Sequence, residues 1–517
     1  MRWGKGGDLF ATAGLGRGGV EPRPRSRTPA TGCAGNEALR HTVLVPRRAA
    51  LIAACVAALL ILPGLGLTPL VDWDESIYAA VSLGVLENGP FRLEWNGERY
   101  DRKPPLLFWA MALSYRFLGV SEASARAPSA LAGIATVGLA AWAAARRAGL
   151  VAGLAAPAFL LGSELFLERG GRRACTDALV IAFSMGALVL AQSDRRRSRR
   201  RWGAGGAVGL AILSKGAVGL LAPASLWLAG VTGRDREQRR SAVWIGTVGL
   251  VLASPWYVYR IVADGSAFLA THFGREIMIR VLQPIHGTGA PWWYPLWVLW
   301  RGGGPWVVLA FGAAAASALA DRSRRPETAP WIIAAILVLG VSMAMQTKLP
   351  WYPLAVLPML AVSGSIALGG ALLPEDSRIA VALRVGFALI ALATLSTAGR
   401  AREDVLAGER EFEDFRRLGT RVAAIVAEEP FIGATEEHPS LVFYGGRPIR
   451  RFGADELDRL VLDPKALPRT ALVPAEHAGA LLAAGAVELG RLGDRVLVRR
   501  GASSEVLSSR DVQAARP

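Results

Sequence analysis

The sequence predicts a polytopic α-helical membrane protein with about eleven spans, followed by a small α/β domain. Two observations support this fold class. The chain has 517 residues, of which 52% are hydrophobic, and its mean hydropathy is +0.32. Its apolar residues gather into runs of roughly 20, the length that crosses a bilayer. Its arginines gather in short clusters between these runs, as in cytoplasmic loops that follow the positive-inside bias.

Composition also excludes other classes. The net charge of +17 does not indicate nucleic-acid binding, because the basic residues sit between apolar runs instead of forming one basic surface. Only three cysteines occur, so neither a disulfide framework nor a thiolate metal site is predicted. Residues 1–46 are rich in Arg, Gly and Pro and predict a disordered basic cytoplasmic arm.

The charge clusters predict the path through the membrane. The run 49–67 follows Arg47 and Arg48, so the charged stretch after it faces outside. The next apolar run, 104–120, is short and interrupted by polar residues, and we expect it to lie along the outer interface. If the run 104–120 does not cross the membrane, the span 127–145 ends with the Arg146–Arg147 pair in the cytoplasm; if it did cross, this pair would face outside.

The later spans alternate so that every Arg-rich loop faces the cytoplasm, and together they define a membrane domain over 47–398. After 127–145 they are 149–167, 178–192, a helical pair within 203–232 that turns near Ser214 and Lys215, 241–262, 293–320, 329–345, 350–373 and 377–398. Segments 168–177, 263–292 and 346–348 become external loops. Residues 399–517 lack a spanning run and alternate short apolar stretches with helix-like pieces, which predicts an extracytoplasmic α/β domain.

This path gathers charged residues from separate loops at the outer rim of the bilayer. Lys215 and Lys348 are lone cations flanked by apolar helix, and ionisable groups at membrane depth are functional candidates. Carboxylates beside cations suit sugar transfer from a polyprenyl phosphate, because cations stabilise the departing phosphate and a carboxylate activates the acceptor hydroxyl. The structural alternatives are lysines that reach the headgroups and an acidic pair, Asp74 and Glu75, that begins a helix.

Eight motifs occur in a characteristic order: DWDESIYA, NGERYDRKPPLLFW, ARAPSALAG, ERGGRRACTDALV, LSKGAVGLLAP, SPWYVY, HGTGAPWWYP and QTKLPWYPLAVLP. Over roughly residues 48 to 373, the chain resembles the bacterial branch of the dolichyl-phosphate-mannose–protein mannosyltransferase superfamily. That branch includes the aminoarabinose transferases that modify lipid A. The resemblance implies the GT-C glycosyltransferase fold, with the active site at the first external loop.

The resemblance also implies roles for individual residues. Asp74 would be the catalytic carboxylate, beside Glu75, and Lys103 would contact the donor phosphate. The remaining implied donor-site residues are Tyr78, Asp177, Lys215, His286 and Lys348. Ile77 and Arg102 depart from the aminoarabinose transferase pattern; the missing Glu at 102 makes a metal site doubtful, and we predict neither a metal nor another cofactor.

The prediction is therefore an integral-membrane glycosyltransferase of the cytoplasmic membrane. It would move a sugar from a polyprenyl-phosphate donor to a protein, lipid or glycan acceptor on the outer face, with the bilayer and no nucleic acid as partner. Two alternatives stay open: a secondary transporter, whose charges would line a path near the midplane, and a non-catalytic envelope assembly protein.

Overall fold

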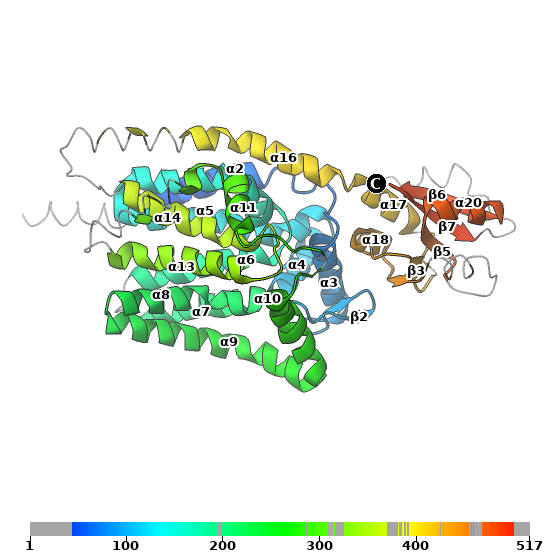
Figure 1. Ribbon diagram of the computed structural model, residues 1–517, viewed down its shortest axis with the longest axis horizontal. Coiled ribbons are helices and arrows are strands. Elements are labelled where there is room, and N and C mark those ends of the chain that lie inside the picture. The colour runs from blue at the N-terminus through cyan, green and yellow to red at the C-terminus, as the bar shows by residue number, and fades with distance from the viewer. Residues whose placement is uncertain are drawn as a thin grey trace, which may run out of the picture.

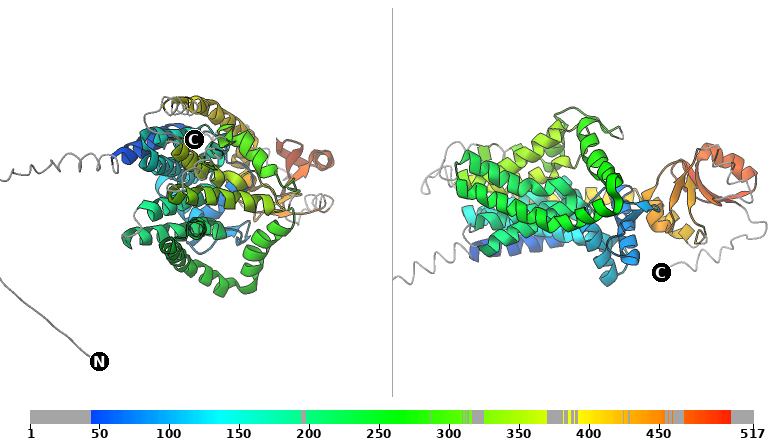
Figure 2. Two further views of the ribbon diagram at one scale, coloured as in Figure 1. Left: turned by 60° about the vertical axis from the view of Figure 1, so that its left-hand side comes forward. Right: turned by 90° about the horizontal axis from the view of Figure 1, so that it is seen from below.

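The computed structural model describes residues 44–500 with interruptions, and these form a helical bundle with an α/β domain at one end (Figure 1). The two further views in Figure 2 show the same division. The positions left out within that range are 194–197, 286, 309, 311, 313, 316–324, 370–380, 382–384, 387–388, 390–391, 424, 428, 454–455, 457–458 and 460–467. Most of the predicted arm 1–46 and half of the predicted span 377–398 lie outside the described residues.

The bundle packs around one large apolar core, rich in alanine where helices lie close together. Its long elements are α2 (Val45–Ile61), α5 (Glu122–Leu161), α6 (Thr176–Ser193), α7 (Ser198–Lys215), α8 (Leu221–Thr232), α9 (Arg236–Leu269), α13 (Arg325–Ala344) and α14 (Val356–Gly369). Within the described residues, five stretches are long and apolar enough to cross a membrane: 122–161, 176–193, 198–232, 236–282 and 327–344. The fold class predicted from the sequence, a polytopic helical membrane protein, is confirmed.

Two of these stretches each contain a pair of predicted spans. Within α5 the backbone leaves the helical region at Ala148 and Gly149, where φ of Gly149 is +79°. A side chain added at Gly153 would collide with Ala145, so the two halves of α5 fold back on each other. Likewise α7 and α8 are joined by the 3₁₀ turn η3 (Gly216–Leu220) directly after Lys215, as predicted for the helical pair.

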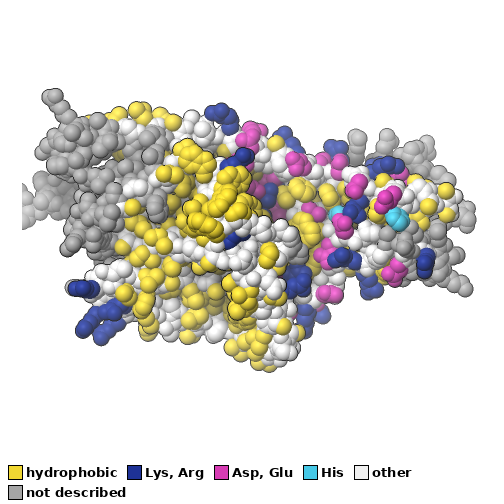
Figure 3. Space-filling view, in the orientation of Figure 1, with side chains coloured by type: hydrophobic (Ala, Val, Ile, Leu, Met, Phe, Trp, Pro, Cys, Tyr) yellow, Lys and Arg dark blue, Asp and Glu magenta, His cyan; other side chains and the backbone are white. Residues whose placement is uncertain are grey.

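The basic ends of several helices share one end of the bundle. Arg146, at the α5 bend, donates to the carbonyl of Ser193 at the end of α6 (3.0 Å). Arg201 pairs with Glu237 (3.2 Å), which joins the start of α7 to the start of α9. In Figure 3, apolar side chains form a band over the middle of the bundle, acidic side chains gather toward the α/β domain, and basic side chains lie at both ends. This separation agrees with the predicted alternation of spans.

The first external loop is structured. Helix α3 (Asp74–Asn88), the short hairpin β1 (Glu94–Trp95) and β2 (Glu98–Arg99), and helix α4 (Leu106–Leu118) follow α2. Helix α4 has 13 residues, about 20 Å at 1.5 Å per residue, which is less than the roughly 30 Å of a hydrocarbon core. Its length fits the predicted interfacial position of the run 104–120.

The segment 263–292, predicted as a loop, is largely helical. Helix α9 bends at Gly265, where φ is +55°, and continues as the π-helix η4 (Ala270–Ile279) and α10 (Arg280–Leu282). The segment contains no proline before Pro284, so nothing in the backbone ends the helix at the membrane boundary. The helical extension carries its charged residues back over the end of the bundle.

Two short elements complete the end of the bundle nearest the α/β domain. Helix α11 (Tyr294–Gly303) is preceded by the exposed side chains of Trp292 and Trp293. The 3₁₀ helix η5 (Tyr352–Ala355) precedes α14. An antiparallel bridge between Gly289 and Thr347 joins the loops before these elements. The loops at 283–293 and 345–351 are thus held together.

The α/β domain follows helix α16 (Ala398–Arg410), which lies beside the bundle in Figure 1. Its further elements are α17 (Glu413–Ala423), β3 (Ile432–Ala434), α18 (Pro439–Gly445), β4 (Ile449–Arg451), β5 (Thr470–Pro474), α20 (Ala475–Ala483), β6 (Ala486–Leu492) and β7 (Arg495–Arg500). The sheet order is β4-β3-β5-β7-β6. Strand β3 pairs in parallel with β4 and β5, and β7 pairs antiparallel with β5 and β6. An α/β arrangement in this part of the chain is what the sequence predicts.

Candidate active site

Asp74 lies at the first residue of α3 and is the most open carboxylate of the predicted site. Its side chain is 39% exposed, and its nearest cation is Arg169, with 3.4 Å between Oδ2 and Nη1. The Arg169 guanidinium stacks on the ring of Trp351 at 3.6 Å. Arg169 is thereby fixed between two loops, and it holds one oxygen of Asp74 while much of the carboxylate stays accessible.

The residue before Asp74 has an unusual backbone conformation. Trp73 has φ of +71°, although it is not a glycine, and its side chain is 57% exposed. A bulky residue in this region is strained and persists only where its surroundings fix it. The α/β domain supplies part of that support, because the backbone N–H and hydroxyl of Ser440 donate to Asp72 Oδ1 at 2.7 and 2.9 Å. The turn that presents Asp74 is therefore held from both parts of the molecule.

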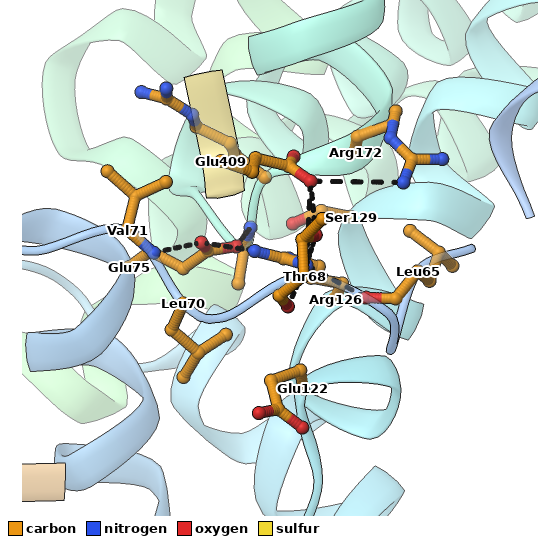
Figure 4. Close-up of polar contacts among 12 residues, drawn as sticks. Leu65, Thr68, Leu70, Val71, Glu75, Glu122, Arg126, Ser129, Arg172 and Glu409 are labelled. Atoms are coloured by element: carbon orange, nitrogen blue, oxygen red, sulfur yellow. Dashed lines mark hydrogen bonds and ion pairs between the residues drawn. The ribbon is translucent and has the colours of Figure 1, made fainter. Parts of the chain in front are cut away.

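Glu75, the other half of the predicted acidic pair, is buried in a hydrogen-bond network (Figure 4). Its carboxylate accepts from Arg126 Nε (2.8 Å) and Nη2 (2.9 Å), and from the backbone N–H groups of Ala174 and Val71 (2.8 Å each). Burial opposes ionisation, but the charge of Arg126 and these hydrogen bonds together lower the pKa of Glu75. No oxygen of Glu75 is left for a substrate.

The same network ties the helix before the α/β domain to the bundle. Arg126 also donates to the carbonyl oxygens of Leu65, Thr68 and Pro69 at 2.6 to 3.0 Å. Glu409 of α16 accepts from the Thr68 hydroxyl at 2.5 Å. These contacts fix the loop between α2 and α3. Glu75 thus helps to fix the geometry of the α2–α3 loop. From the sequence alone, Glu75 is grouped with Asp74, the predicted catalytic carboxylate, and this structural role cannot be distinguished from a catalytic one.

Lys103 belongs to a second charged group, built from the first loop and the helical extension of α9. Its ammonium lies 2.6 Å from Glu276 Oε2, and Arg280 Nη2 lies 3.1 Å from Glu276 Oε1. Arg280 Nη1 also donates to the Tyr352 hydroxyl at 3.3 Å. Two cations separated by more than 170 residues thus point at one place, as cations that bind one phosphate group do.

Asp177 and Lys215 form a third group. They lie at the first turn of α6 and the last turn of α7, and the Lys215 ammonium is hydrogen-bonded and ion-paired to Asp177 Oδ1. The pairing confirms that the turn after α7 and the loop before α6 share one end of the bundle. It also means that the Lys215 ammonium is already paired with a carboxylate of the protein in the absence of a sugar-phosphate donor.

Tyr78 connects these groups. It is fully buried on α3, and burial together with the negative charges of Asp74, Asp177 and Glu276 raises its pKa well above the ordinary value. Each of these three carboxylates therefore lies within electrostatic reach of the Tyr78 hydroxyl. The predicted residues Asp74, Tyr78, Lys103, Asp177 and Lys215 are therefore brought to one end of the bundle.

Two predicted residues stand apart. Lys348 is buried, and its ammonium donates to the carbonyl oxygens of Ser342, Met343 and Met345, at the C-terminal end of α13. These contacts terminate a helix in the manner of a C-cap. They occupy the three N–H groups of Lys348, which were predicted from the sequence to bind the sugar-phosphate donor. His286 lies outside the described residues. No three His, Cys, Asp or Glu side chains converge within the described ranges to suggest a metal site.

Residues 102–259 match the family described as dolichyl-phosphate-mannose-protein mannosyltransferase. The crystal structure of ArnT from Cupriavidus metallidurans bound to undecaprenyl phosphate has a TM-score of 0.69 and 21% identity, covering 88% of this chain and 98% of that one. The apo state of the same protein gives a TM-score of 0.67.

The chain has the GT-C fold. The resemblance predicted from the ordered motifs is confirmed by the family match and by the fold of these neighbours. The undecaprenyl phosphate-alpha-4-amino-4-deoxy-L-arabinose arabinosyl transferase of Pectobacterium carotovorum is 28% identical over 314 residues, covering 56% of this chain and 55% of that protein. An uncharacterized protein of Aquifex aeolicus is 28% identical over 202 residues, covering 38% of this chain and 40% of that protein. The chain matches about half the length of these curated relatives.

Sequence reasoning missed part of this candidate site. Glu276 and Tyr352 were not predicted, and Arg169 and Arg280 lie in the predicted external loops 168–177 and 263–292 but were assigned no role. Their signal is weak, because Glu276 lies in the segment THFGREIMIR, which looks like an ordinary amphipathic stretch. Only the bend at Gly265 and the π-helix that follows bring this segment over Lys103.

Proposed function

We propose that the protein is an integral-membrane glycosyltransferase that moves a sugar from a polyprenyl-phosphate donor to a hydroxyl-bearing acceptor. The observation that carries the proposal is the convergence of Lys103 and Arg280 on one anionic position, at the end of the bundle where the accessible carboxylate of Asp74 also lies. The family match over 102–259 and the bound undecaprenyl phosphate of the structural neighbour support a lipid phosphate as the leaving group.

The reaction follows from these positions. The Asp74 carboxylate takes the proton of the acceptor hydroxyl, and the acceptor oxygen attacks the anomeric carbon. The bond from that carbon to the phosphate oxygen breaks, its electron pair stays on the phosphate, and the carbon is inverted. Lys103 and Arg280 stabilise the charge that develops on the phosphate. Arg169 keeps the Asp74 carboxylate in place during the attack.

The proposed location is the outer face of the cytoplasmic membrane. Arg146, Arg201 and their neighbours lie at the end of the bundle that is remote from the site, and positive charge favours the cytoplasmic side. The site and the α/β domain would then face outward. A lipid-linked donor suits this side, because its sugar is already activated and no nucleotide is needed there.

The test compares Asp74→Asn with a matched control on the same helix, Glu87→Gln, whose side chain lies exposed at the other end of α3. Each variant is expressed in a strain that lacks the protein, and envelope glycans are analysed by mass spectrometry. We expect Asp74→Asn to lower transfer by about 10²- to 10⁴-fold, as removal of a general base does. Glu87→Gln should restore the wild-type glycan. Wild-type glycan in the Asn variant would remove Asp74 from the mechanism.

A further inference from the structure

The phosphate position proposed above contains an anion of the protein. Lys103 and Arg280 supply two positive charges there, and Glu276 supplies one negative charge at 2.6 and 3.1 Å from them. The Glu276 side chain is 9% exposed, so solvent screens it weakly. The two cations at contact distance stabilise its ionised form. This group of three residues, the phosphate cradle, therefore carries one net positive charge.

The cradle has donors to spare. Lys103 has three N–H donors, and one is used by Glu276. Arg280 uses Nη1 for Tyr352 and Nη2 for Glu276, while its buried Nε–H has no partner. A buried donor without a partner costs free energy, so a ligand that accepts a hydrogen bond there is stabilised. A phosphate group can accept from these free donors while Glu276 keeps its own contacts.

We propose that Glu276 sets the charge of the cradle so that it selects the phosphodiester donor over the phosphomonoester product. The inference rests on the proposed function and adds to it a specificity-determining residue. A phosphodiester carries one negative charge, which the cradle's single positive charge neutralises. A phosphomonoester carries about 1.5 to 2 negative charges at neutral pH, which leaves the occupied cradle with excess negative charge beside Glu276.

The charge difference gives the reaction a direction. When the bond between sugar and phosphate breaks, the electron pair adds a second negative charge to the phosphate, within the cradle. The Glu276 carboxylate then repels the phosphomonoester more strongly than it repelled the phosphodiester, and this repulsion favours release of the polyprenyl phosphate. Without Glu276 the cradle would carry two positive charges, which match the product better than the donor. Glu276 thus acts by promoting release and takes no part in forming or breaking bonds.

The experiment compares two lipids that differ by one charge, undecaprenyl phosphate and its phosphate methyl ester. Affinities are measured on the purified full-length protein in nanodiscs for wild type, Glu276→Gln and Glu276→Asp. The matched control is Glu98→Gln, an exposed carboxylate on the neighbouring hairpin. We expect Glu276→Gln to raise the affinity for undecaprenyl phosphate about tenfold relative to the methyl ester, or about 1.4 kcal/mol.

The other variants and the pH sharpen the result. Glu276→Asp keeps the charge and should keep the wild-type ratio of affinities, as should Glu98→Gln. At about pH 5 a phosphomonoester carries mostly one negative charge, so wild type should bind the two lipids with equal affinity. In transfer assays, Glu276→Gln should show stronger inhibition by undecaprenyl phosphate.

The outcomes separate the two proposals. If wild type binds both lipids but Glu276→Gln leaves their ratio unchanged or lowers both affinities equally, Glu276 only packs the cradle and this inference is wrong. If wild type binds neither lipid, the proposed glycosyltransferase function fails, and the inference fails with it.

Discussion

Two charged regions include residues of the first external loop, and they differ in burial and in how their hydrogen-bonding groups are used. Around Glu75 and Arg126 both side chains are almost fully buried, and the carboxylate accepts four hydrogen bonds. Around Lys103, Glu276 and Arg280 the side chains are partly open, and the Nε–H of Arg280 has no partner. The Glu75 carboxylate is satisfied by the protein alone, although Glu409 Oε1 and Arg172 Nε at the edge of its network are also buried without a partner. The second region differs in that its cations are partly open and keep free donors, so accessibility together with unused donors separates the site from the framework.

Breaking the buried region at its centre should have the largest effect on stability. In Arg126→Met, Glu75 loses its buried partner, and the carbonyl oxygens of the α2–α3 loop lose their donor. Removal of one partner of a buried ion pair costs about 3–5 kcal/mol, so we expect little folded protein in membranes. Expression and thermal unfolding in detergent measure this, with Arg116→Met as a control on the short helix α4. Wild-type stability of Arg126→Met would show that the network is dispensable.

Glu75→Gln sharpens the comparison within that region. The amide keeps the shape of the side chain but removes the charge beside Arg126, and a buried charge left without its partner costs about 3 kcal/mol or more. We expect a lower unfolding temperature, while the protein that does fold transfers sugar at a rate much nearer to wild type than Asp74→Asn does. Stability and transfer are measured on the same preparation. Loss of transfer with unchanged stability would move Glu75 from the framework into the catalytic machinery.

Ser440→Ala tests the smallest contribution, the support given by the α/β domain. The variant removes the hydroxyl hydrogen bond to Asp72, but the backbone N–H of residue 440 still donates. One hydrogen bond to a charged group contributes about 1.5–3 kcal/mol at most, so the fold should persist. We expect faster hydrogen exchange in residues 70–76 and a few-fold loss of transfer, because the strained Trp73 is less well fixed. Unchanged exchange would mean that the domain does not support this turn.

The sequence alone predicted a polytopic helical membrane protein, an order of helices and several charged residues that the structure brings to one end of the bundle. Apolar runs and arginine clusters act along the chain, so they can be read in order, and the bends at Ala148–Gly149 and after Lys215 lie where that reading requires. The three motifs that contain Asp74, Lys103 and Asp177 also predicted that these residues lie at one end of the bundle. These features depend on local composition and on alternation across the membrane.

Tertiary structure decided which charges belong together. Asp74 and Glu75 are adjacent in sequence, yet the helix turns one toward an open site and the other into a buried network with Arg126. Lys348 closes the end of a helix, and Glu276 reaches Lys103 across 173 residues. Partners of this kind are set by how helices bend and pack, and burial then determines whether a charge is satisfied by the protein or left for a ligand. That information lies between segments and not within any one of them.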